Sequence, residues 1–136
     1  MPTAKPAKKL ATGPDFPTVF AALREVLATH AGKFAVATDS PAQYTLLTCS
    51  PSPFPQHKGQ PMWFAEARLG KAYVSLHLMA LYFNTELVAT ISPELKKRMQ
   101  GKTCFNFQSM PEPALLAELR RLSKASVQVF AQRKWL

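Results

Sequence analysis

The pair of residues best suited to covalent chemistry in this sequence is Cys104 with His77. A thiol becomes a nucleophile when a neighbouring base accepts its proton or lowers its pKa. The two residues share one sheet face if the strands that carry them are adjacent, and Asn106 is the nearby residue that could orient the base. No local motif requires this arrangement, and buried cysteines are commonly inert. We therefore predict no catalytic residues, favour a protein that is not an enzyme, and keep a thiol enzyme on Cys104 as a lesser alternative.

The sequence indicates neither a metal site nor a cofactor. It has no histidine pair at i, i+4, no Cys-x-x-Cys, no glycine-rich phosphate loop and no Gly-x-Ser-x-Gly elbow. Two cysteines are too few for a disulfide framework, so we expect a reducing compartment. The candidate ligands match no established spacing: His30, His57, His77, Cys49 and Cys104.

The chain is basic, with 17 Lys or Arg against 8 Asp or Glu and a formal net charge of +9. An excess of this size favours contact with anions, which makes nucleic acid one candidate partner. Residues 1–14 are rich in Pro, Ala and Lys and predict a flexible basic arm. No secretory h-region follows this arm, and the apolar run 73–83 is too short to cross a bilayer. We expect a cytoplasmic protein that makes no membrane contact.

Apolar periodicity predicts a first helix that begins at an Asp15 cap, has Pro17 in its first turn and stops at Gly32. A leucine stripe predicts a last helix over residues 111–134. Residues 50–61 hold four prolines and predict an exposed loop. Between the two helices, apolar and β-branched runs predict strands at 34–38, 43–49, 63–69, 72–79 and 103–107.

The segment after residue 79 is expected to turn at Tyr82-Phe83-Asn84 and to form a short helix over residues 86–90. A second helix is predicted from a Ser92 cap to Gly101. Runs of strands flanked by helices indicate an α+β fold. We predict one domain over residues 15–136, with an antiparallel β-sheet of about five strands flanked by N-terminal and C-terminal helices.

Strand 72–79 has two different faces. Val74, Leu76 and Leu78 form an apolar face, whereas the opposite face has intermediate polarity and is expected to be covered by a helix, a loop or a partner. Aromatic bodies with polar tips, together with a cation, can orient a small ligand or an anionic group. The alternative is that these side chains pack under the terminal helices. The predicted ligand-binding residues are Trp63, Tyr73, Ser75, His77, Tyr82, Lys102 and Asn106.

Residues 73–107 also carry a family signature. Its most specific part is Ser92-Pro93-Glu94-Leu95 followed by Gly101-Lys102-Thr103-Cys104-Phe105-Asn106-Phe107, and it includes Tyr73-Val74-Ser75, His77-Leu78-Met79, Tyr82 and Asn84. This segment resembles the YdhG-like family of small bacterial domains, most of unknown function. The resemblance implies an antiparallel sheet backed by helices. Some members are described as frataxin-like iron chaperones, a role that uses clustered oxygen ligands, whereas the eight acidic residues here are scattered.

We therefore predict a YdhG-like, non-enzymatic binding module for a small anionic ligand or a protein partner, acting as a monomer or homodimer. A nucleic-acid-binding protein that uses the basic surface is the alternative. A thiol enzyme and an iron chaperone are less favoured.

Overall fold

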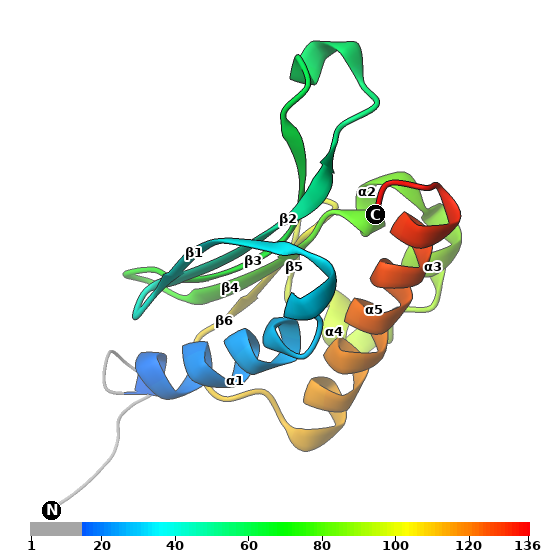
Figure 1. The fold of residues 1–136 in the computed structure, drawn as a ribbon. Helices are drawn as coiled ribbons and strands as arrows, with labels where there is room; N and C mark the ends of the chain where they lie inside the picture. Colours follow the sequence, from blue (N-terminus) through cyan, green and yellow to red (C-terminus); the bar gives the residue numbers. More distant parts are fainter. Residues whose placement is uncertain (1–14) are drawn as a thin grey trace, which may run out of the picture.

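Six strands form one antiparallel sheet in the computed structural model, which describes residues 15–136 (Figure 1). The strand order is β1-β2-β3-β4-β6-β5. This confirms the predicted α+β class, with a sixth strand beyond the five expected, while the predicted basic arm at 1–14 lies outside the described residues. The strands are β1 Ala35–Ser40, β2 Gln43–Pro51, β3 Pro61–Leu69, β4 Val74–Leu78, β5 Met99–Gln100 and β6 Cys104–Phe107.

Two long helices flank the sheet, and three short ones connect β4 to β5. None of the helices within residues 15–136 has the length and apolarity needed to span a bilayer. The helices are α1 Phe16–Ala28, α2 Ala80–Phe83, α3 Thr85–Ala89, α4 Pro93–Lys96 and α5 Pro113–Gln132, with 3₁₀ turns η2 at Ala31–Lys33 and η3 at Pro55–His57.

Three predicted helices are shorter in the structure, one of them α5, which spans Pro113–Gln132 rather than residues 111–134. Helix α1 ends at Ala28 rather than at Gly32, because Thr29 hydrogen-bonds back to the Val26 carbonyl and a 3₁₀ turn follows. Asp15 occupies the N-cap position but makes no side-chain capping bond. Helix α4 ends at Lys96, since the chain beyond it leaves the helix to pair with β6 as strand β5.

Of two further predictions for the segment between β4 and β5, one is wrong and one is confirmed. The turn predicted at residues 82–84 is instead helix α2 followed by the cap of α3, with the Asn84 side chain accepting from the Leu87 amide. The predicted Ser92 cap is confirmed, because its hydroxyl accepts from the Leu95 amide at 3.2 Å. Glu118 of α5 in turn accepts from the Ser92 amide and hydroxyl at 2.7 and 2.6 Å, which ties α4 to α5.

The proline-rich segment 50–61 forms the end of a long β2–β3 hairpin that projects from the sheet (Figure 1). Strand β2 runs on to Pro51 and β3 begins at Pro61, so the predicted loop is shorter than expected. Proline has no amide to donate, and the pairing here is irregular, continuing as a Ser52 amide to Gln60 carbonyl bond of 2.8 Å. We call residues 51–61 the hairpin arm.

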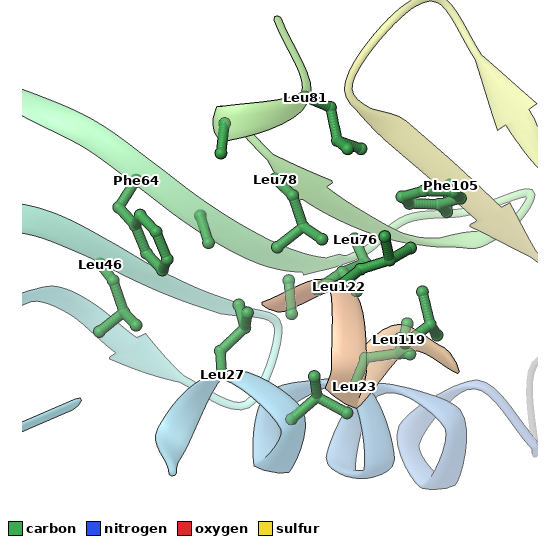
Figure 2. Packing of buried hydrophobic residues seen from close by; sticks show 14 of the residues in the cluster. Leu23, Leu27, Leu46, Phe64, Leu76, Leu78, Leu81, Phe105, Leu119 and Leu122 are labelled. Carbon is green, nitrogen blue, oxygen red and sulfur yellow. The ribbon is translucent and has the colours of Figure 1, made fainter. Parts of the chain in front are cut away.

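The hydrophobic core lies between one face of the sheet and helices α1 and α5. Figure 2 shows leucines of both helices directed at large apolar side chains of the strands. The predicted alternation is confirmed, since Val74, Leu76 and Leu78 are all fully buried in this layer. Other members are Leu23, Leu27, Leu46, Phe64, Phe105, Leu119 and Leu122.

We predict that Leu76→Ala lowers the free energy of unfolding by about 2–5 kcal/mol, because it removes a buried side chain and leaves a cavity. Urea denaturation followed by circular dichroism measures this change. Val36→Ala is the control on exposed strand β1, and we expect it to cost less than about 1 kcal/mol. Equal losses in the two variants would contradict the one-sided core.

Candidate functional site

The sheet face opposite α1 and α5 carries polar and aromatic side chains, and among residues 15–136 no helix covers it (Figure 1). We call it the open face. His77 of β4 is paired with Glu66 of β3 and with Cys104 of β6. Two residues earlier in β4, Ser75 is paired with Arg68 of β3 and Asn106 of β6. The alternative that these residues pack beneath the terminal helices is therefore wrong.

Glu66 is held in the middle of the open face by side chains of β2. It is only 8% exposed, and its Oε1 accepts hydrogen bonds from the Thr45 hydroxyl at 2.8 Å and the Gln43 amide at 2.9 Å. A carboxylate at this depth needs such donors, because its desolvation would otherwise be costly. These hydrogen bonds join β2 to β3 on the open face and hold the Glu66 carboxylate in place, in the residue paired with His77.

A hollow of about 560 Å³ lies where β3 turns into β4. Gly70 makes this turn feasible, since a Cβ there would lie 2.9 Å from the Tyr73 carbonyl oxygen. The turn places Lys71 and Tyr73 beside side chains of β3, β4 and β6. We call this hollow the basic pocket; its lining is Arg68, Gly70, Lys71, Ala72, Tyr73, Ser75, His77, Gln100 and Cys104.

His77 is half-buried at the edge of this pocket. Burial is the main cause that lowers its pKa below the ordinary 6.5, the Glu66 charge opposes the shift, and the Arg68 charge adds to it. The imidazole is thus held mainly neutral at pH 7, able to donate one hydrogen bond and accept another. Its ring lies 5.3 Å from that of Trp63, centroid to centroid.

Cys104 lies beside His77 in the sheet, as the thiol-enzyme alternative required, but its environment favours the protonated thiol. Burial raises the pKa of Cys104 above its ordinary value. The thiol donates to Asn106 Oδ1 at 3.1 Å, and the Asn106 amide donates to Gln100 Oε1 at 2.7 Å. This chain of hydrogen bonds orients a neutral thiol and leaves it a poor nucleophile.

A second hollow of about 670 Å³ lies between the hairpin arm and α2. Phe54 of the arm stacks on Phe83, with ring centroids 5.9 Å apart and planes 8° from parallel, and both rings meet Trp135 edge-on. We call this hollow the aromatic cleft; its lining is Phe54, Gln56, His57, Gln60, Pro61, Met62, Trp63, Met79, Tyr82, Phe83 and Thr103.

The seven residues of the predicted ligand face are divided among these hollows. Tyr73, Ser75 and His77 line the basic pocket, whereas Trp63 and Tyr82 line the aromatic cleft. The Lys102 ammonium lies 5.3 Å from the Tyr82 ring centroid, and both residues line a third hollow. Asn106 lines none of the three and acts through Cys104 and Gln100.

In β3, Trp63 lies on the open face and Phe64 lies in the core, where its ring is stacked on that of Phe34 with centroids 4.0 Å apart. The sequence reasoning missed Arg68, Lys71 and the aromatic residue Phe54. Period-2 alternation along 65–68 places Glu66 and Arg68 opposite Ala65 and Ala67, a signal that could have found Arg68. The alternation does not extend to Trp63, because the β2–β3 register shifts between Leu46 and Leu47. No local signal brings Phe54 to Phe83.

Within residues 15–136, no three His, Cys, Asp or Glu side chains are grouped so that they could hold a metal ion. Comparisons with protein-family models, curated proteins and solved structures find no match to this chain. The YdhG-like resemblance of residues 73–107 therefore stays a prediction.

We predict that iodoacetamide modifies Cys104 more slowly than free cysteine at about pH 7.5, because the raised pKa reduces its thiolate fraction. Cys49→Ser removes the exposed cysteine and isolates this rate, which mass spectrometry follows. If Cys104 were modified as fast as free cysteine, the result would contradict the raised pKa and support the thiol-enzyme alternative.

We predict that stability falls as the pH is lowered through about 6.5, because His77 binds a proton more readily in the unfolded chain than in the folded protein. His77→Gln should reduce this loss, measured as the change in urea midpoint between about pH 7.5 and about pH 5.5. Burial is also the main cause that lowers the pKa of His30, so His30→Gln measures the contribution of that residue separately. An unchanged loss in His77→Gln would contradict the assigned shift.

Proposed function

We propose that this protein is a non-enzymatic binding module that takes a small anionic ligand in the basic pocket. The observation that carries the proposal is the presence of two cations, Arg68 and Lys71, in the lining of a hollow that also contains hydrogen-bonding groups. Neither cation is in an ion pair with a carboxylate of the described chain. An anion would supply the missing partner.

The chemistry of the pocket suits a carboxylate or phosphate group. An Arg side chain can bind either group through two parallel N–H donors, and hydrogen bonds to an ionised group are stronger than neutral ones. Ser75, Tyr73 and neutral His77 add polar groups that can fix the orientation of the ligand. The volume of about 560 Å³ lies in the range typical of small-molecule sites.

Glu66 forms no ion pair with Arg68 or Lys71 and does not line the pocket, and its carboxylate accepts hydrogen bonds from Thr45 and Gln43 on the β2 side of the open face. Cys104 contributes a neutral wall, since burial raises its pKa. This supports binding without thiol chemistry, since Cys104 lines the pocket as a protonated thiol.

A nucleic-acid-binding protein is the second candidate. The exposed residues Lys96, Lys97 and Arg98 lie at the end of α4 and immediately before β5, whose Gln100 lines the basic pocket. A phosphate backbone that crossed this edge would contact both groups of cations. Its affinity would fall steeply with added salt, in proportion to the phosphates neutralised.

We predict that inorganic phosphate or citrate raises the thermal midpoint and that Arg68→Gln weakens the binding roughly tenfold or more, because a charge-assisted contact is lost. A ligand at about 100 times its dissociation constant adds about 2.7 kcal/mol of stability, a shift of several degrees. Isothermal titration calorimetry gives the affinities of both proteins.

Arg98→Gln is the matched control, because Arg98 is exposed, lines none of the three hollows and lies in no ion pair within the described chain. Equal weakening by the two variants would contradict a site at the basic pocket. A salt-sensitive shift with oligonucleotides, lost in Arg98→Gln, would favour nucleic acid. If neither phosphate nor citrate raised the thermal midpoint, the result would contradict the proposal and favour a protein partner.

A further inference from the structure

The basic pocket and the aromatic cleft meet on the open face. Trp63 lines the cleft and His77 lines the pocket, and their ring centroids are 5.3 Å apart with planes tilted by 50°. The successive residues Thr103 and Cys104 line the cleft and the pocket respectively. A molecule leaving the basic pocket towards the hairpin arm therefore passes directly over His77 and Trp63.

The cleft itself is suited to a flat apolar group. Four aromatic rings and two methionines make up most of its apolar lining, and none of the Lys, Arg, Asp or Glu residues of the described chain line it. Its polar lining residues are neutral amide and hydroxyl groups and one imidazole: Gln56, Gln60, Thr103 and His57. Aromatic surfaces bind planar groups by stacking or edge contacts, with burial of apolar area as the main gain. The charge that such a ligand could carry must thus be accommodated outside the cleft, and the adjacent cations are Arg68 and Lys71.

One wall of the cleft is held in place before any ligand arrives. Phe54 of the hairpin arm is stacked on Phe83, and Trp135 contacts Phe54, Phe83 and Phe130 at centroid distances of 5.6, 4.9 and 5.1 Å. Trp135 is buried by these contacts, which anchor the arm to α5. A wall that is already ordered lowers the entropy cost of binding.

We propose that a single ligand occupies both hollows: an organic anion with a planar apolar body in the aromatic cleft and its acidic group in the basic pocket. This inference rests on the proposed function and specifies its ligand class. Trp63 is the residue that contacts the planar body, and Arg68 and Lys71 hold the acidic group. The charge beside an otherwise apolar cleft argues for an amphipathic anion over a neutral aromatic compound.

The test uses three probes that separate the two halves of the ligand: naphthalene-2-sulfonate, methanesulfonate and 2-naphthalenemethanol. Calorimetry on the full chain should give one naphthalene-2-sulfonate per protein, bound roughly tenfold or more tightly than either half. Methanesulfonate should displace it competitively. Naphthalene-2-sulfonate that binds no better than methanesulfonate would overturn the inference.

Two variants test which residues bind each half of the ligand. Trp63→Ala should weaken naphthalene-2-sulfonate roughly tenfold and leave methanesulfonate unchanged, whereas Arg68→Gln should weaken both. Tyr82→Ala repeats the first test at a cleft residue that is 58% exposed, so we expect this variant to fold as the unmodified protein does. Met110→Ala, an exposed apolar residue outside the three hollows, is the control and should change neither affinity.

The two proposals fail in different ways. If Arg68→Gln leaves methanesulfonate binding unchanged, the anion site is wrong, and the proposed function fails with it. If Arg68→Gln matters but both cleft variants leave naphthalene-2-sulfonate unchanged, only the shared ligand is wrong. Independent binding of methanesulfonate and 2-naphthalenemethanol, without any gain in affinity for the joined probe, would likewise show two separate sites.

Discussion

The burial of only one face of the sheet is the constraint on which the rest of this structure depends. Helices α1 and α5 supply leucines to a single apolar layer, and strands β2, β3, β4 and β6 contribute buried side chains to it. The side chains between them must then lie on the open face. On this face the buried Glu66 carboxylate is stabilised by hydrogen bonds from Thr45 and Gln43. Hydrogen bonds therefore order side chains on the open face, whereas apolar packing orders those on the opposite face.

This arrangement also explains why the two candidate sites adjoin. The tight turn at Gly70 ends one side of the open face and brings Lys71 next to Arg68. The long β2–β3 hairpin ends the other side and brings Phe54 to Phe83. Trp63 and His77 lie between the two ends, so a polar, cationic hollow and an aromatic one share a boundary.

Local patterns in the sequence predicted much of this fold, because alternation along 72–79 and 103–107 directly reports which face is buried. The Ser92 cap was predictable for the same reason, as its hydrogen bond to Leu95 is local. Helix α4 was predicted too long because Met99 and Gln100 pair with β6, an interaction distant from any helix signal. The division of the site depends on such pairings too: Lys102 follows Gly101, whose φ of 74° turns the chain towards Tyr82 and away from Ser75.

The most direct test of the open face as the functional surface is a ¹H–¹⁵N correlation spectrum recorded during titration with inorganic phosphate. The account predicts that the largest shifts fall on the residues that line the basic pocket: Arg68, Gly70, Lys71, Ala72, Tyr73, Ser75, His77, Gln100 and Cys104. Helices α1 and α5, on the opposite side of the sheet, should show little change. Shifts concentrated on Lys96–Arg98 and along α5, with the basic pocket unchanged, would contradict the claim.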